Sequence, residues 1–423
     1  MLHDIKPEEH PLLGQEMAEA VSTCVHCGFC LAACPTYKEL GQEADSPRGR
    51  IVLMKEVLEG KLELAAALPH IDPCLGCLAC EPACPSGVPY RDLISPFRAQ
   101  SESKRQRPLI QRFTRWMTQF TLPHPKRFRL AARTGKLAKP LSFMLPNAMR
   151  VMLDLLPPQL PKQQVWKENY PAIGSQRARV ALLTGCAQSV LDPDINTATI
   201  EVLNQNGAEV VVPKNQACCG ALSWHVGNLP QARQFASQNV HAFPDDVDAI
   251  VTNAAGCGSG MHEYHLILKG TADEAKAEVF RHRVQDVASF LTQLGDLKTP
   301  PDPGRKRRIA YHDACHLANA QGVRSEPRHL LQMIPGVELR EITDAHLCCG
   351  SAGTYNIDQP EIAASLGKQK ASNVMATGAE IVATGNIGCM TQLSNHLSKQ
   401  ASGIQVRHTM QVLRDAYIGN ITN

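Results

Sequence analysis

The sequence predicts a multidomain protein in which an all-α N-terminal domain is followed by two homologous α/β domains with parallel sheets. Two observations support this fold class: two cysteine motifs of identical spacing near the N-terminus, and a cysteine pattern in the remainder that occurs twice. A chain of 423 residues is too long for one hydrophobic core, so several domains are expected. We expect domains at residues 1–103, 178–303 and 304–423, joined by a basic, proline-containing helical linker at 104–177.

The two N-terminal cysteine motifs share the spacing C-x2-C-x2-C-x3-C-P. Bacterial two-cluster ferredoxins hold two 4Fe-4S clusters with this spacing. Three cysteines of each motif surround one cluster, whereas the fourth, fixed by a proline, is directed towards the other cluster. This crossover predicts the ligands Cys24, Cys27, Cys30 and Cys84 for cluster 1, and Cys74, Cys77, Cys80 and Cys34 for cluster 2.

Structural zinc sites are the alternative for these motifs, because C-x2-C pairs also suit tetrahedral zinc. Zinc would leave the third cysteine and the final Cys-Pro of each motif without a role. Iron-sulfur clusters are therefore the preferred interpretation.

A helix is predicted between the two motifs. Ser46 and Pro47 are typical of a helix start, and Gly60 is typical of the residue after a helix end. Apolar side chains between them share one helical face: Ile51, Met54 and Leu58. The helical insert favours an α-helical ferredoxin domain over the compact β-containing type.

The predicted linker is strongly basic. Between Lys104 and Leu153 there are twelve Lys or Arg residues and no Asp or Glu. The helix expected at its start has an apolar stripe with two arginines beside it: Ile110, Phe113, Met117 and Phe120, with Arg112 and Arg115. Such a helix suits an anionic membrane surface or an acidic partner, and it equally suits a linker packed on its own protein with a solvated basic face.

The C-terminal part of the chain contains an internal repeat. The cysteines of its first copy recur after 129, 130, 130 and 132 residues: Cys186, Cys218, Cys219 and Cys257, then Cys315, Cys348, Cys349 and Cys389. Two copies of one domain are implied. Strands are expected before these cysteines, at 180–183, 210–212 and 249–252 in the first copy and at 309–311, 337–342 and 380–383 in the second.

Strands that alternate with helices indicate a parallel sheet, and ligands of such sheets bind beyond the carboxyl ends of the strands. The cysteines of each repeat follow such ends, so we expect them to converge on one site per repeat. The alternative is that they are small core residues, as buried cysteines often are. Their loop positions, with the doubled Cys-Cys-Gly, make this alternative weaker.

Composition and charge exclude some functional classes. The net charge of +3 is too small to indicate nucleic-acid binding, and no nucleic-acid motif is present. The polar N-terminus has no apolar core of a secretory signal, and no run of apolar residues is long enough to span a bilayer. We therefore expect a reducing cytosol in which metal-bound thiolates account for the cysteines.

Four segments together resemble the iron-sulfur subunits of bacterial glycolate oxidases: Cys24-Val-His-Cys-Gly-Phe-Cys30, Cys34-Pro-Thr-Tyr37, Ser46-Pro-Arg-Gly-Arg50 and Cys348-Cys-Gly-Ser-Ala-Gly-Thr-Tyr355. The resemblance covers nearly the whole chain. It implies an α-helical ferredoxin domain followed by two cysteine-rich CCG domains, which also occur in heterodisulfide reductase and in the anaerobic glycerol-3-phosphate dehydrogenase iron-sulfur subunit.

The resemblance also implies a role in a complex. FAD-containing partner subunits would oxidise glycolate, and D-lactate as a possible second substrate, and this subunit would pass the electrons to a quinone-type acceptor. The complex would be peripheral on the cytoplasmic face of the inner membrane. The residues agree on one point, since the sequence has no G-x-G-x-x-G fingerprint after a strand and no nucleophile elbow. Substrate chemistry is therefore expected on another chain.

The sequence departs from the fullest CCG pattern, in which the last element is C-x2-C. The positions of the fifth thiolates are occupied by Gly260 and Gln392, which argues against the noncubane cluster of heterodisulfide reductase. The four thiolates of one repeat still suffice for a cubane 4Fe-4S cluster, so a third cluster in a CCG domain is compatible with the sequence. The candidate ligand sets are Cys186, Cys218, Cys219 and Cys257 in the first repeat, and Cys315, Cys348, Cys349 and Cys389 in the second.

Four histidines near these cysteines are further candidates: His225, His312, His316 and His346. Histidine can replace cysteine on iron or move protons, but most lone histidines are ordinary hydrogen-bonded residues. His312 and His316 flank Cys315 and are the candidates for a proton role.

Two other functions compete with electron transfer. One is a thiol-disulfide reductase whose CCG domains perform the chemistry, against which the missing fifth cysteines argue. The other is an iron-sulfur scaffold or redox sensor, which would need a regulatory thiol or partner-binding domain outside the motifs, whereas every cysteine falls inside a motif.

Overall fold

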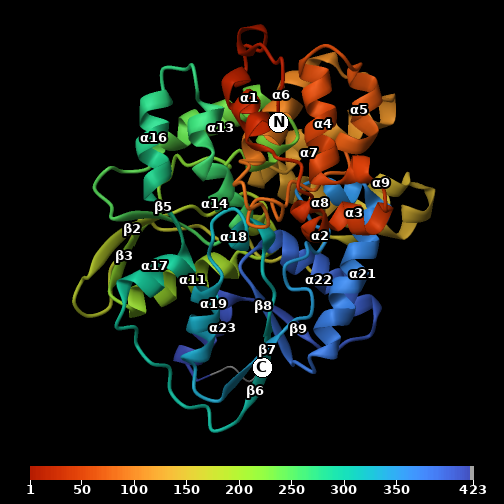
Figure 1. The fold of residues 1–423 in the computed structure, drawn as a ribbon. Helices are drawn as coiled ribbons and strands as arrows, with labels where there is room; N and C mark the ends of the chain where they lie inside the picture. Colours follow the sequence, from red (N-terminus) through yellow and green to blue (C-terminus); the bar gives the residue numbers. More distant parts are fainter. Residues whose placement is uncertain (420–423) are drawn as a thin grey trace.

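The computed structural model describes residues 1–419, apart from the side chains of Leu141 and Asn147. An N-terminal helical domain lies above two α/β repeats that stand side by side (Figure 1). The helical elements of the N-terminal domain are η1 (Pro7–Glu9), α1 (Gly14–Thr23), α2 (Phe29–Ala33), α3 (Pro35–Leu40), η2 (Glu43–Asp45), α4 (Pro47–Leu58), α5 (Leu64–Ile71), α6 (Arg91–Ser101) and η3 (Glu102–Lys104).

Helix α4 is the helix predicted between the cysteine motifs. The Ser46 hydroxyl accepts a hydrogen bond from the Gly49 amide at 3.0 Å, and Pro47 is the first helical residue. The predicted apolar face is buried against the other N-terminal helices: Ile51, Met54 and Leu58. The α-helical character of this domain is therefore confirmed.

Each repeat is built on its own sheet. The first has the strand order β1-β3-β2-β4-β5, and the second has the order β7-β6-β8-β9. The strands are β1 (Asn169–Tyr170), β2 (Ala178–Leu182), β3 (Ala208–Val211), β4 (Ala249–Thr252), β5 (Val284–Asp286), β6 (Arg307–Tyr311), β7 (Val337–Glu341), β8 (Ile381–Thr384) and β9 (Gln405–His408).

The sheets confirm the expected parallel pairing with one exception. The second sheet is entirely parallel, whereas β1 pairs antiparallel with β3 at the edge of the first. All six predicted strands are present, with ends within two residues of those expected. Strands β1, β5 and β9 were not predicted, because they are short and lack a continuous apolar run.

The two repeats share one hydrophobic core. Helix α11 (Asp194–Gln205) of the first repeat packs on α23 (Thr409–Tyr417) of the second, and α17 (Val287–Leu294) of the first packs on α19 (Ser325–Gln332) of the second. Helices α11 and α19 correspond, because they follow the equivalent strands β2 and β6. Helices α17 and α23 correspond in the same way after β5 and β9. Each repeat therefore presents the same two helices to the other repeat. The repeats are thus related by an approximate two-fold axis.

Shorter helices and the covering helices complete the repeats. They are α10 (Gln188–Leu191), α12 (Ala221–His225), α13 (Leu229–Ala242), α14 (Ala255–His262), α15 (Tyr264–Ile267), α16 (Glu274–Arg283), α18 (Cys315–Ala318), α20 (Tyr355–Asp358), α21 (Pro360–Ala376) and α22 (Ile387–Lys399).

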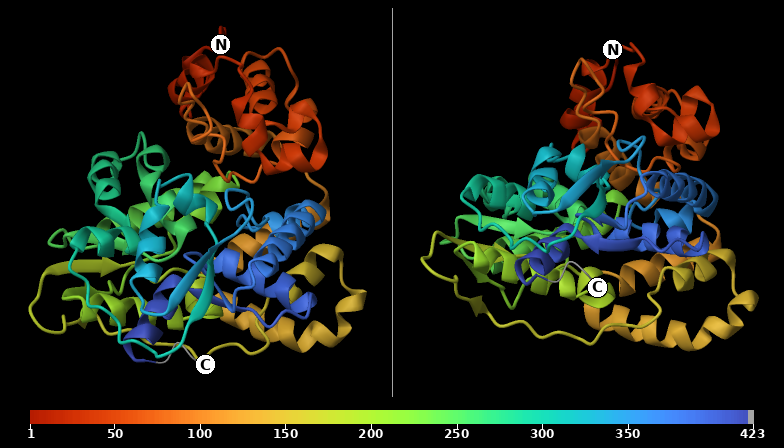
Figure 2. Two further views of the ribbon diagram at one scale, coloured as in Figure 1. Left: turned by 60° about the horizontal axis from the view of Figure 1, so that its bottom comes forward. Right: turned by 90° about the horizontal axis from the view of Figure 1, so that it is seen from below.

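The linker helices lie along the repeats, away from the first N-terminal helices (Figure 2). They are α7 (Leu109–Thr121), α8 (Pro125–Ala138), η4 (Lys139–Met144) and α9 (Asn147–Asp154). Helix α7 buries Thr114 and Thr118, whereas Phe113, Trp116 and Phe120 are exposed. The helix is therefore packed on its own protein through its polar side, and most of its predicted apolar stripe faces solvent.

We expect the shared core to make the repeats unfold together. Leu413 is fully buried in this core, so Leu413→Ala should cost about 2–5 kcal/mol of unfolding free energy. Hydrogen exchange should then accelerate in β2 and β4 of the first repeat as well as in β6 and β8. Ile418→Ala is the matched control, because Ile418 is exposed. Faster exchange confined to the second repeat would contradict a shared core.

Candidate metal centres

The cysteines assigned to cluster 1 lie around one cavity. Cys24, Cys27, Cys30 and Cys84 all line it together with Cys80, so the fourth cysteine of the second motif lies among the first three of the first motif. Cys24 is buried and Cys27 is exposed, which puts the cavity at the surface of the N-terminal domain. Burial raises the pKa of Cys30 to about 11, so at neutral pH this thiol needs a metal to become a thiolate.

The cysteines assigned to cluster 2 lie deeper. All four are buried: Cys74, Cys77, Cys80 and Cys34. Burial raises the pKa of Cys77 and of Cys80 well above the usual range, and the charges of Cys34 and Cys74 add to this rise. Cys34 is thus near enough for its charge to act on Cys77 and Cys80, and its role as a ligand of cluster 2 stays a prediction. Four thiols gathered at each of two places are the ligands that two 4Fe-4S clusters need.

A buried arginine lies beside this second set. The Arg50 guanidinium contacts Cys34 Sγ at 3.8 Å and donates to Thr36 Oγ1 at 2.9 Å and to the His70 carbonyl at 2.6 Å. Burial alone would raise the pKa of Cys74, but the positive charges of Arg50 and Arg98 outweigh burial and lower this pKa. The role of Arg50 was not predicted, although its position on the same face of α4 as Met54 is a signal that it faces the core.

In the first repeat the four cysteines also come together. Cys186 Sγ lies 3.4 Å from Cys218 Sγ. Hydrogen bonds from Cys218 and then Cys257 lower the pKa of Cys219 well below its usual range, so the Cys219 sulfur interacts with both of these thiols. Cys218 and Cys219 follow β3, and Cys257 lies in the first turn of α14, which follows β4. The site is thus beyond the carboxyl ends of the strands.

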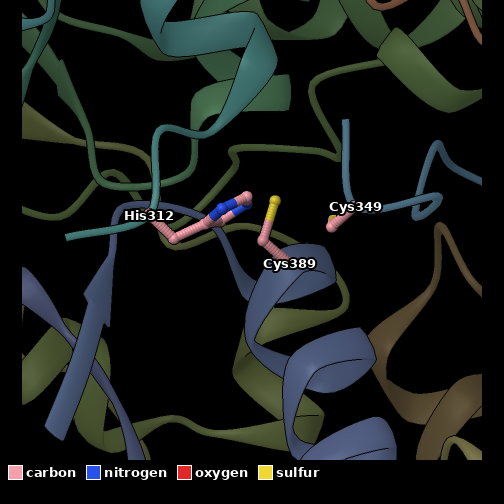
Figure 3. A group of neighbouring side chains, drawn as sticks. All are labelled: His312, Cys349 and Cys389. Carbon is pink, nitrogen blue, oxygen red and sulfur yellow. The ribbon is translucent and has the colours of Figure 1, made fainter. Parts of the chain in front are cut away.

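The second repeat has the corresponding site with an added histidine. Cys315 Sγ lies 3.9 Å from Cys348 Sγ, and Cys348 in turn interacts with Cys349. Ligand atoms of Cys349, Cys389 and His312 lie within 4.8 Å of one another, and all three residues are buried (Figure 3). Burial lowers the pKa of His312 to about 3, which keeps the imidazole neutral and able to bind a metal.

The loop that carries Cys74, Cys77 and Cys80 contacts both repeats. From the second repeat, His316 donates to the Gly76 carbonyl at 2.9 Å, and Asn319 donates to the Cys77 carbonyl at 3.1 Å. From α6, Arg98 donates to the Cys74 carbonyl at 2.6 Å and to the His225 carbonyl of the first repeat at 3.2 Å. The three cysteine-rich regions therefore meet at this loop.

The remaining candidate histidines have different surroundings. The rings of His225 and His316 are 5.2 Å apart. His225 Nε2 also lies 3.5 Å from Glu263, a buried carboxylate that accepts a hydrogen bond from Trp224 at 2.6 Å. This carboxylate was not predicted, since nothing in its local sequence distinguishes it. His346 is exposed and does not belong to the His312 group.

Comparison with known proteins agrees with this arrangement. A 4Fe-4S dicluster domain matches residues 20–88, and a cysteine-rich domain matches residues 180–262 and again 309–394. A probable glycolate oxidase iron-sulfur subunit of Bacillus subtilis is 37% identical, with 93% of each chain covered. The chain belongs to the glycolate oxidase iron-sulfur subunit family. A second member, the glycolate oxidase iron-sulfur subunit of Escherichia coli, is 36% identical, with 95% of each chain covered.

A more distant relative is named as part of a different complex. This protein, a subunit of the CoM/CoB fumarate reductase of Methanothermobacter marburgensis, is 28% identical over 98% of this chain and 75% of its own. As in the glycolate oxidase iron-sulfur subunits, the similarity spans both the cluster motifs and the repeats. Iron-sulfur clusters are thus the cofactors that the family and the cysteine geometry support together.

Among residues 1–419, no helix has both the length and the apolar character that crossing a bilayer requires.

Removing one predicted ligand from each set should reveal the size of each iron site. Cys77→Ser should lower the iron content of the anaerobically purified protein by about four atoms per chain, because it takes one ligand from a 4Fe-4S site. Iron analysis with sulfide determination gives the measurement. Cys27→Ser should lower it by a similar amount. If Cys77→Ser retained all of its iron, Cys77 would not be a cluster ligand.

Proposed function

We propose that this chain is the iron-sulfur electron-transfer subunit of a membrane-associated, FAD-dependent glycolate oxidase. In this proposal FAD-containing partner subunits oxidise glycolate to glyoxylate, with D-lactate as a second substrate, and a quinone-type acceptor receives the electrons. The similarity to glycolate oxidase iron-sulfur subunits over more than nine-tenths of the chain carries the proposal. Bound iron-sulfur clusters would supply one-electron transfer.

The protein residues in this proposal hold and insulate a series of neighbouring sites. Cys24, Cys27, Cys30 and Cys84 would hold cluster 1, and Cys80 also borders their cavity. Cys34, Cys74, Cys77 and Cys80 would hold cluster 2. Leu75, Cys77 and Ala79 pack in one apolar cluster with Cys348 and Tyr355 of the second repeat, which supports continuity between the N-terminal domain and that repeat.

The candidate sites contain thiols, histidines and buried arginines, but the sequence offers no flavin fingerprint after a strand. This pattern supports placing the hydroxy-acid chemistry on the partner subunits. The thiol-disulfide reductase alternative is less well supported, because Gly260 and Gln392 stand where the fifth thiolates would be.

The isolated chain should not oxidise glycolate. Adding the FAD-containing subunits with a dye or quinone acceptor should produce glyoxylate, because oxidation at the 2-carbon needs the flavin. The same mixture with Cys27→Ser protein should lose most of its dye reduction through this subunit. Glycolate oxidation by the flavin-free chain alone would disprove the subunit assignment.

We further propose that α7 contacts the cytoplasmic face of the inner membrane. Its exposed aromatic residues form a continuous group, in which Trp116 stacks on Phe120 at 5.3 Å and lies 6.0 Å from Phe113. Trp116 is 58% exposed, which is a large exposed area for an aromatic side chain. The Arg127 guanidinium lies 4.2 Å from the Phe120 ring, so a cation borders the group. An aromatic surface bordered by cations suits the interface of an anionic bilayer.

The arginines of α7 divide between two sides. Arg112 is exposed beside the aromatic group, whereas Arg115 pairs with Glu102 at 3.2 Å and donates to the carbonyl of Val226. Arg115 therefore anchors α7 to the protein and does not belong to the free basic surface. A test of membrane contact must leave it in place.

Replacing Phe113, Trp116 and Phe120 by Ser should reduce binding to vesicles that contain anionic lipid, as measured by co-sedimentation. Arg112→Gln with Lys126→Gln and Arg127→Gln should weaken binding by about 1 kcal/mol per charge, and high salt should have a similar effect. Val279→Ser, at an exposed apolar residue on α16, is the control and should bind as the native protein does. Undiminished binding of the triple serine variant would disprove the proposed membrane contact.

A further inference from the structure

We propose that His312 is a ligand to iron in the second repeat, which gives that repeat five protein donors where the first repeat has four. The inference rests on the proposed metal site of the second repeat and adds an imidazole to its cysteines. It also makes the two repeats chemically different.

The placement of His312 is the first argument. His312 directly follows β6, Cys349 follows β7, and Cys389 lies in the first turn of α22 after β8. Their ligand atoms lie within 4.8 Å of one another, although the residues come from three separate segments of the chain (Figure 3). The imidazole points towards the Cys389 sulfur, which lies beside the end of the ring, so one ion can contact both. Imidazole is a good ligand for iron beside thiolates.

The second argument is that His312 lacks a partner. Its side chain is buried, and neither Nδ1 nor Nε2 has a hydrogen-bond partner among the described residues. An unsatisfied buried polar group costs about 1–3 kcal/mol, so nearly all such groups in proteins are satisfied. A metal bound to one ring nitrogen would provide the missing partner. By contrast, the buried His408 ring contacts the Asn253 carbonyl at 2.8 Å and caps α23.

The third argument is the comparison between the repeats. Leu183 occupies the position of His312 in the first repeat. The Leu183 amide donates to the Val251 carbonyl at 3.0 Å, and the His312 amide donates to the Ala383 carbonyl at 2.8 Å, so the backbone contacts correspond. The fold therefore accepts an apolar side chain at this position and does not require a histidine. The presence in the second repeat of a buried histidine without a hydrogen-bond partner in the described part of the chain points to a role in binding.

The fifth donor also bears on the missing fifth thiolate. Gln392 stands where the fullest CCG pattern has its last cysteine, and the Gln392 amide donates to the Ala363 carbonyl at 2.9 Å. Its side chain therefore has another role. His312 reaches the same group of cysteines from the segment that follows β6, and would restore the number of donors to five.

Pulsed EPR of the full-length protein labelled with 15N-histidine tests this inference. We expect a strong 15N coupling to a paramagnetic iron centre in the native protein, and its loss in both His312→Leu and His312→Cys. His312→Leu copies the first repeat, whereas His312→Cys supplies a thiolate and should retain iron while losing the coupling. His396→Leu is the matched control on α22, the helix that carries Cys389, and it should keep the coupling.

Two results would overturn the inference in distinguishable ways. If Cys349→Ser lowered the iron content but native protein showed no 15N coupling, or the coupling persisted in His312→Leu, the site would exist without His312 as a ligand. If Cys349→Ser left the iron content unchanged, the proposed metal site of the second repeat would itself be wrong.

Discussion

The loop from Pro73 to Cys80 is fixed by hydrogen bonds to its carbonyl groups, and the relation between the domains depends on these bonds. Tyr355 donates to the Pro73 carbonyl at 2.8 Å, and His316 and Asn319 of the second repeat donate to the carbonyls of Gly76 and Cys77. A buried carbonyl without a donor is costly, so the loop and the second repeat must remain together. Arg91 adds a contact from α6 by donating to the Ala320 carbonyl at 3.2 Å.

With an iron-sulfur cluster bound, the same loop would concentrate negative charge in a buried region. Thiolates that hold iron carry charge into a medium of low polarity, and such charge must be compensated. Arg50 provides a fixed cation on one side, and Arg98 provides another while it joins the loop to the first repeat. These arginines therefore have two roles: they hold backbone carbonyls, and they lower the energy of the charged state of neighbouring thiolates.

The local features of this molecule could be predicted, whereas its contacts between distant segments could not. Cysteine spacing and the start of α4 at Ser46 depend on a few neighbouring residues, and both were found from the sequence. The contact between His316 and Gly76 joins residues 240 positions apart, so no local pattern reports it. Glu263 was missed for the same reason, because its partners Trp224 and His225 come from another helix.

Helix α7 shows a different limit of sequence interpretation. Its periodicity identifies an apolar face, but it does not determine which side of the helix packs against the rest of the protein. Thr114 and Thr118 are small enough to let the helix approach the first repeat closely, while Gln231 of that repeat donates to the Gln119 carbonyl at 3.1 Å. Packing therefore follows polar contacts here and leaves the bulky aromatic side chains outside.

The reciprocal packing of α11 on α23 and of α17 on α19 is the contact that a symmetric homodimer of a single repeat would make. In a homodimer any substitution appears in both subunits, so both sites change at once. Joining the two copies in one chain removes that restriction and keeps the halves at high effective concentration. Leu183 and His312 illustrate the result: two sites of common architecture have been free to diverge within one molecule.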